Sequence, residues 1–83
     1  MNSIIREILS KFGQLPVPVD TIADEADLYA AGLSSFASVQ LMLGLEDAFD
    51  IEFPDSMLNR KSFASISAIE TTVKAILDGK EAA

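Results

Sequence analysis

Apolar residues recur at helical spacing in three stretches of this chain, which favours helices over strands. The first two stretches cover about residues 3–12 and 35–50, and the third follows Ser65. Side chains at this spacing share one face of a helix, and that face has to be buried against another element. The chain is therefore expected to be all-α, as a bundle of packed helices in a single domain over residues 1–83.

A long connection, residues 14–34, is expected between the first two helices. Gly13 is suited to end the first helix, and Pro16 and Pro18 prevent the helix from continuing. Four apolar residues are expected to anchor the connection to the bundle: Val19, Ile22, Leu28 and Tyr29. Four acidic residues are expected to be solvated, because their spacing does not match a calcium-binding loop: Asp20, Asp24, Glu25 and Asp27.

The last third of the chain is expected to hold one short helix and one longer helix. Asp55 or Ser56 is placed to cap the short helix, across residues 57–61. Ser65 is the preferred cap of the longer helix, which Gly79 is expected to end, with the residues beyond it frayed. These elements complete a predicted four-helix bundle, with three longer helices and one short third helix.

The absence of histidine and cysteine restricts the chemistry open to this chain. Ser-His and Cys-His nucleophile pairs, disulfides and the usual zinc sites are ruled out, so neither enzymatic activity nor a metal site is expected. A net charge of −7 disfavours binding to nucleic acid or an anionic membrane, and it either favours a basic protein partner or serves solubility. With no signal peptide or membrane span expected either, a cytoplasmic location follows.

The turn Gly32-Leu33-Ser34-Ser35-Phe36 delivers two serines to the start of the second helix. Ser34 is well placed as the N-cap, with its hydroxyl accepting from an N–H one turn in. Neither serine has a basic partner to activate it, so we interpret one of them as an attachment point; the alternative is a second capping serine without modification. A phosphodiester here would meet free N–H groups and the positive end of the helix dipole, with no need for a basic side chain.

The order of the elements and four segments of the sequence resemble the acyl carrier protein superfamily over essentially the whole chain. The segments are Gly32-Leu33-Ser34-Ser35-Phe36, Val39-Gln40-Leu41, Glu46-Asp47-Ala48-Phe49-Asp50 and Phe53-Pro54-Asp55. In that family, a serine in a Gly-x-Asp-Ser-Leu motif carries 4′-phosphopantetheine. The resemblance therefore implies that Ser35 carries this cofactor, that a phosphopantetheinyl transferase attaches it, and that Ser34 caps the helix beside it.

Several positions depart from the fatty-acid carriers of this superfamily. Ser34 replaces the acidic residue before the attachment serine, Phe36 replaces Leu or Met, and Gln40 stands where an acidic residue is usual. The segments 39–43 and 59–63 are more similar to stand-alone aminoacyl carrier proteins. That resemblance implies an activated amino acid, glycine or alanine, held as a thioester. It also implies an amino acid:carrier protein ligase that loads the amino acid and a downstream acceptor protein.

Partners are expected to bind along the second helix and the loop before it. The candidate residues are Phe36, Gln40, Leu41 and Gly44, with Arg60 and Lys61 contacting the cofactor or the ligase. Gly44 has a second interpretation, because an interior glycine also permits close packing within the bundle. Two other functions are open at this point: a carrier of fatty or polyketide acyl chains, and an unmodified adaptor that docks proteins on an apolar second helix.

Overall fold

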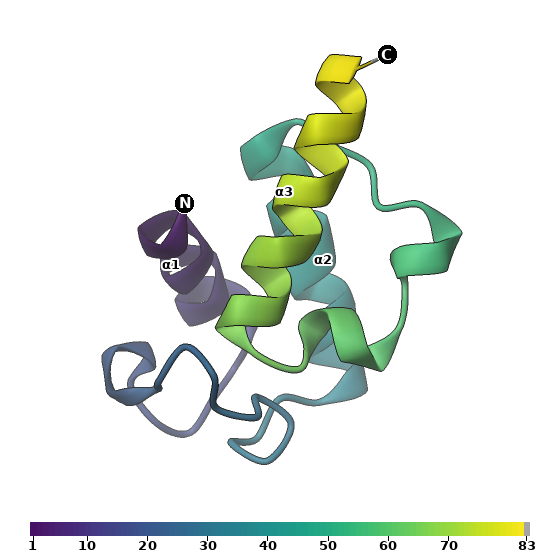
Figure 1. Cartoon of the computed structure of the whole chain (residues 1–83). Helices are drawn as coiled ribbons and strands as arrows, with labels where there is room; N and C mark the ends of the chain where they lie inside the picture. The colour runs from purple at the N-terminus through teal and green to yellow at the C-terminus, as the bar shows by residue number, and fades with distance from the viewer. Residues whose placement is uncertain (83) are drawn as a thin grey trace.

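The computed structural model describes residues 1–82. They form three α-helices and three short 3₁₀ turns: α1 (Asn2–Phe12), η1 (Val19–Thr21), α2 (Ser35–Phe49), η2 (Asp55–Met57), η3 (Arg60–Phe63) and α3 (Ile66–Ala82). Helix α1 packs against both α2 and α3. The long connection closes the end of the bundle at which α2 and α3 begin (Figure 1). No strand occurs among the described residues, so the predicted all-α class is confirmed.

The core is built from apolar side chains that share one face of each helix. The fully buried members are Ile5, Leu9, Leu28, Leu41, Leu45, Ile66, Ile69 and Val73. Each buried side chain of this size contributes about 1.5–3 kcal/mol relative to an exposed one. The predicted anchors of the connection are confirmed, because Ile22 and Leu28 are buried while Val19 and Tyr29 pack against the core. None of the described helices is long and apolar enough to cross a membrane.

The predicted short third helix is wrong. Met57 ends η2, Arg60 begins η3, and the two residues between them belong to neither turn. Neither Asp55 nor Ser56 caps a helix with its side chain. The cause is Asn59, whose backbone is extended (φ −141°, ψ 163°) and whose side chain accepts a hydrogen bond of 3.0 Å from the Ser62 N–H. An asparagine that bonds the backbone in this way competes with continuous helix. The described chain is therefore a three-helix bundle with 3₁₀ turns.

Helix α1 ends at Gly13, as predicted, but without the left-handed conformation that is common after a helix. Gly13 is right-handed (φ −73°), and the left-handed residue is Gln14 (φ 52°). Glycine is needed at position 13 because a Cβ there would lie 2.6 Å from the Leu9 carbonyl oxygen. Helix α2 ends at Phe49, one residue earlier than expected, with Asp50 in the left-handed conformation (φ 53°).

The end of α3 differs from the prediction, while its start agrees with it. Ser65 caps the helix, since its hydroxyl oxygen accepts a 3.0 Å hydrogen bond from the Ala68 N–H. Gly79 does not end the helix, which continues to Ala82. Gly79 lacks the positive φ of a helix stop, so the backbone passes through it as ordinary helix. The predicted fraying extends to Ala83, which lies outside the described residues.

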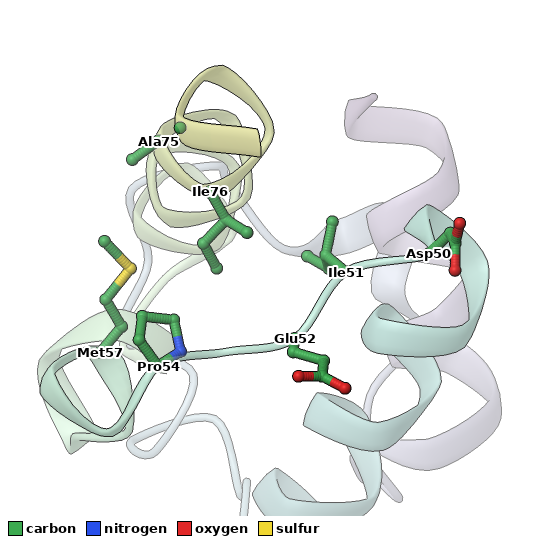
Figure 2. A pocket seen from close by; sticks show the side chains of 8 residues that line it. Asp50, Ile51, Glu52, Pro54, Met57, Ala75 and Ile76 are labelled. Atoms are coloured by element: carbon green, nitrogen blue, oxygen red, sulfur yellow. The ribbon is translucent and has the colours of Figure 1, made fainter. Parts of the chain in front are cut away.

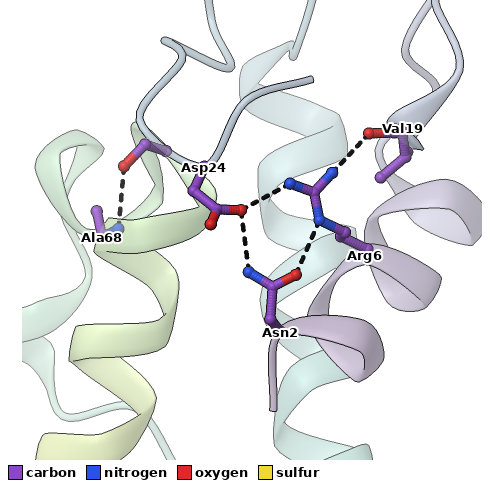
Figure 3. A network of polar contacts seen from close by, with 6 residues as sticks. Asn2, Arg6, Val19, Asp24 and Ala68 are labelled. Carbon is purple, nitrogen blue, oxygen red and sulfur yellow. Dashed lines mark hydrogen bonds and ion pairs between the residues drawn. The ribbon is translucent and has the colours of Figure 1, made fainter. Parts of the chain in front are cut away.

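Asp24 links the long connection to two helices rather than being simply solvated. Its carboxylate accepts hydrogen bonds from the Asn2 amide (3.0 Å) and from Arg6 Nη2 (2.6 Å), as Figure 3 shows. These two groups, first Asn2 and then Arg6, lower the pKa of Asp24 below its ordinary value of 3.8. The Asp24 carbonyl oxygen also accepts from the Ser67 N–H of α3, at 2.9 Å. The connection is therefore held against α1 and α3.

A second acidic residue of the connection also has a structural role. The Asp27 carboxylate accepts hydrogen bonds from the backbone N–H groups of Tyr29 (2.9 Å) and Ala30 (3.3 Å). This is the local capping that aspartate provides in turns. Asp20 and Glu25 are exposed, as the sequence predicted. Asp24 and Asp27 thus shape the chain that leads to the glycine turn before α2.

Candidate functional site

The glycine turn before α2 is held by close packing on both sides. Gly32 has a φ of 120°, and a Cβ there would lie 2.7 Å from Pro16 Cδ, so both conformation and space require glycine. The next residue, Leu33, is buried, and its N–H donates a hydrogen bond of 2.9 Å to the Leu28 carbonyl oxygen. The turn therefore fixes where the two serines emerge.

The two serines have different environments. Ser34 is extended (φ −87°, ψ 163°), and its Oγ accepts a 3.0 Å hydrogen bond from the Ala37 N–H, which confirms the predicted N-cap. Ser35 is the first residue of α2 and is exposed. Its hydroxyl makes no hydrogen bond within the described residues, although its carbonyl oxygen accepts from Ser38 Oγ at 2.7 Å. Of the two exposed hydroxyls, that of Ser35 is therefore the one without a hydrogen bond within the described residues.

Ser35 opens onto an apolar groove between α2 and the η2–η3 segment. The groove has a volume of about 390 Å³. It is lined by Tyr29, Ser35, Ser38, Val39, Met42, Leu58, Asn59, Arg60 and Phe63. The sequence predicts Tyr29 only as an apolar anchor of the connection. Its position in the groove depends on how the connection folds back on α2. An apolar groove with a few polar groups at its rim is suited to a flexible ligand that carries both methyl and amide groups.

The two adjacent cations of the chain lie on different surfaces. Arg60 lines the groove with Ser35, and its guanidinium carbon lies 4.2 Å from the centre of the Tyr29 ring. Lys61 lines a separate polar groove with Glu25 and Ser65. Although the sequence has no Lys or Arg between Lys11 and Arg60, the fold brings one cation back to the start of α2.

Two of the expected partner residues have to be corrected, because one lies in the core and the other packs against α1. Leu41 is fully buried, so it cannot contact a partner in this conformation. Gly44 faces α1, where an added Cβ would lie 2.8 Å from Phe12 Cδ2, so close packing within the bundle is its role. Phe36 is 67% exposed and Gln40 is half-buried, so both are accessible.

The exposed apolar face of α2 is formed by Phe36, Val39 and Leu43. Val39 and Leu43 are 53% and 55% exposed, and neither was among the expected partner residues. The helix has no charged side chain before Glu46. Three exposed apolar residues at helical spacing make an apolar stripe that water solvates poorly. We call these three residues the exposed α2 face.

A second groove lies beyond the other end of α2. Its volume is about 700 Å³, and its lining includes Asp50, Glu52 and, on α3, Ile76. Figure 2 shows Ile51, Pro54, Met57 and Ile76 around it. The length of α2, which rises about 1.5 Å per residue, lies between this groove and Ser35. It therefore contributes nothing to the environment of Ser35.

These features define a class of protein. A small helical domain that presents an exposed serine at a helix start beside an apolar groove has the form of a carrier domain. The model of the family described as "Phosphopantetheine attachment site" matches residues 3–73. The chain belongs to this phosphopantetheine-attachment family. The predicted family and cofactor are thereby confirmed.

Similar proteins narrow the class. The chain is 87% identical, over 83 residues and the full length of both proteins, to an aminoacyl carrier protein of Agrobacterium fabrum. A carrier protein from Agrobacterium tumefaciens was solved with AMP and an engineered Bradyrhizobium japonicum glycine:[carrier protein] ligase. That match has a TM-score of 0.88 at 86% identity and covers 89% of this chain and 99% of that chain.

A more distant structure shows the same fold. It is a crystal structure of Bradyrhizobium japonicum glycine:[carrier protein] ligase with glycylated carrier protein. The match has a TM-score of 0.73 at 32% identity and covers 86% of this chain and 95% of that chain. The resemblance to aminoacyl carriers that the sequence predicted is therefore confirmed.

Proposed function

We propose that this chain is a carrier that holds an activated amino acid as a thioester on a phosphopantetheine arm attached to Ser35. The similarity to aminoacyl carrier proteins supports the class of cargo, and the structures with glycine ligases favour glycine over alanine. The observation that carries the attachment site is the exposed hydroxyl of Ser35, which makes no hydrogen bond within the described residues, beside Ser34, whose hydroxyl caps α2. The proposed setting is the cytoplasm, where ATP for amino acid activation is available.

In this proposal, the protein positions groups and does no catalysis. The arm supplies a thiol that bears the cargo. Ser35 Oγ forms the phosphodiester, and the base that removes its proton comes from the transferase, because the chain has no histidine and no described side chain accepts a hydrogen bond from Ser35 Oγ. The first turn of α2 stabilises the added negative charge through its unpaired N–H groups and the positive end of its dipole.

The proposed ligase contact is the exposed α2 face together with Gln40. An accessible apolar stripe beside the attachment serine can be buried by a partner while the arm reaches the partner's active site. The second helix was the predicted recognition element, and its burial pattern supports Phe36, Val39, Gln40 and Leu43 as the residues a partner would reach. A downstream acceptor would use the same end of the molecule.

The test has two stages. The chain is co-expressed with a broad-specificity phosphopantetheinyl transferase, and intact mass is measured for wild type, Ser34→Ala and Ser35→Ala. Wild type and Ser34→Ala are expected to gain one prosthetic group and Ser35→Ala none. Equal mass gain in Ser35→Ala would disprove the attachment site, and no gain in the wild type would favour the unmodified adaptor.

Loading is then measured on the modified protein. Glycine with ATP and a glycine:carrier protein ligase is expected to give a glycyl thioester, while a fatty-acyl carrier synthetase gives no product. The apolar groove beside Ser35 makes the fatty-acyl or polyketide carrier the second candidate. Acylation by the fatty-acyl enzyme without aminoacylation would therefore replace the proposed cargo by that one.

A further inference from the structure

Arg60 is a cation without a countercharge in the groove beside Ser35. No acidic residue lines that groove. The ion pairs of the described residues join Arg6 to Asp24, Lys11 to Glu7 and Lys74 to Glu70, so none of them includes Arg60. Its contact within the described chain is the stack on Tyr29, at 4.2 Å. An acidic molecule thus keeps one guanidinium without an ion-pair partner among the described residues in the groove that Ser35 also lines.

The stack on Tyr29 is the weaker of two interactions open to this guanidinium. Arg60 is exposed while Tyr29 is half-buried, and a cation–π contact gains little when water screens the cation. A guanidinium that donates to phosphate oxygens forms charge-assisted hydrogen bonds in a planar, two-pronged geometry. A phosphodiester on Ser35 would bring one such negative group to the rim of the groove that Arg60 lines. Exchange of the aromatic partner for the phosphate is therefore favourable once the serine is modified.

We propose that Arg60 is a positioning residue that leaves Tyr29 and binds the phosphodiester of the arm attached to Ser35. This inference rests on the proposed function. The arm would then leave the serine along the groove, with its methyl groups toward apolar residues such as Val39 and Met42. Lys61 has no such role, because it lines the separate groove with Glu25 and Ser65.

This geometry provides a matched pair of variants. Arg60→Gln and Lys61→Gln remove the same charge from adjacent residues, but only Arg60 shares the groove with Ser35. A third variant, Tyr29→Leu, removes the competing aromatic ring and leaves the charge of Arg60 in place. Each modified protein is isolated and its prosthetic group confirmed by intact mass. The unmodified forms are compared by amide NMR spectra to show that all variants keep the fold.

The phosphorus-31 NMR signal of the modified proteins then tests the inference. Relative to wild type, Arg60→Gln is expected to shift the phosphodiester signal, Tyr29→Leu to shift it in the opposite direction, and Lys61→Gln to leave it unchanged. In the wild type, modification is also expected to shift the Arg60 side-chain N–H and the Tyr29 ring signals. Equal effects of the two charge variants, or no change in either, would overturn the role of Arg60. Failure of the wild type to gain the prosthetic group would instead overturn the proposed function.

Discussion

Ser34 and Ser35 are adjacent and chemically identical, but the start of α2 gives their hydroxyls different tasks. Ser34 lies just outside the helix, and its Oγ satisfies the Ala37 N–H, which has no acceptor within the helix. Ser35 lies inside the first turn, and its hydroxyl forms no hydrogen bond within the described chain. One serine therefore contributes to stability, and its neighbour is free to carry a group.

This division predicts that two alanine substitutions have unequal effects on stability. Ser34→Ala is expected to lower the free energy of unfolding by about 1 kcal/mol, because an N-cap is lost. Ser35→Ala is expected to change it by less than about 0.5 kcal/mol, as is usual for an exposed residue without a partner. Urea unfolding of the unmodified proteins measures both values. Equal losses in the two variants would contradict the assignment of the cap to Ser34.

Asp24 predicts a pH dependence of stability. Asn2 and, after it, Arg6 lower the pKa of its carboxyl in the folded state, so the unfolded chain takes up this proton first as the pH falls. The stabilisation is therefore present at neutral pH and is lost as the pH falls below 3.8 toward the lowered pKa. Asp24→Asn is expected to weaken the dependence of Tm on pH in that window, and Asn2→Ala to weaken it in part. Thermal unfolding at a series of pH values measures this dependence. A slope in Asp24→Asn identical to that of wild type would disprove this role.

Helices α2 and α3 each contain an interior glycine. The surroundings of the two glycines differ, so an added side chain would have different effects at the two positions. A Cβ at Gly44 would lie 2.8 Å from Phe12 and 2.9 Å from Ile8, so α1 can approach α2 closely only if the residue is glycine. A Cβ at Gly79 would meet nothing within 4 Å. At Gly79, the helix accepts a glycine that has no packing function.

Alanine at these two positions is expected to change stability in opposite directions. Gly44→Ala should destabilise the fold by about 1–3 kcal/mol, as overpacked cores do, despite the better helix propensity of alanine. Gly79→Ala should stabilise it by up to about 1 kcal/mol, because propensity alone acts there. Chemical unfolding at neutral pH compares the two directly. Stabilisation by Gly44→Ala would show that Phe12 moves aside at little cost.

Helix α2 also shows where prediction from the sequence reaches its limit. Its existence, its cap and its start could be predicted, because Gly32 and Ser34 act locally. Its buried face could not, because apolar residues occupy nearly the whole circumference of the helix. Ala37, Leu41 and Leu45 share one stripe, while Phe36, Val39 and Leu43 share another at equally helical spacing. Only the packing of α1 and α3 decides which stripe is buried.

The site has a similar limit. Ser35 could be predicted from its motif, because the glycine turn and the cap lie within a few residues of it. The approach of Arg60 and Tyr29 could not, since it depends on how the connection and the η3 turn fold back on α2. The η3 turn in turn depends on Asn59, whose side chain bonds the backbone and breaks the expected short helix. Local signals were therefore sufficient to place Ser35 at the start of α2, but not to predict its surroundings.

At the scale of the whole molecule, the first part of α2 is an uncharged region of an acidic chain. The chain carries a net charge of −7, yet α2 has no charged side chain before Glu46. Glu46 itself is used within the fold, because its carboxylate accepts a 3.0 Å hydrogen bond from the Phe53 N–H. A partner that binds along the first turns of α2 thus meets the exposed α2 face and no carboxylate of that helix. Recognition at this end of the molecule should depend mainly on apolar burial.

This arrangement predicts that exposed residues control loading without controlling stability. Phe36→Ser and Leu43→Ser are expected to lower the kcat/KM of ligase-catalysed glycine loading about tenfold, which corresponds to about 1.4 kcal/mol of lost contact. Their free energies of unfolding should stay within about 0.5 kcal/mol of wild type, since both side chains are largely exposed. Ile4→Ser is the matched control, because Ile4 is 45% exposed on α1 and outside the α2 face. Its loading rate should equal that of wild type.

Salt separates apolar from electrostatic recognition in the same assay. Raising the ionic strength to about 0.5 M screens exposed charges beyond a few ångströms, but it leaves the burial of apolar surface intact. Added salt is therefore expected to lower the loading rate of wild type by a limited amount. This loss should be smaller than the loss that the Phe36→Ser substitution causes at low salt. A steep loss with salt, together with normal loading of Phe36→Ser and Leu43→Ser, would show the opposite. The carboxylates of this acidic chain, rather than its exposed α2 face, would then be what the ligase recognises.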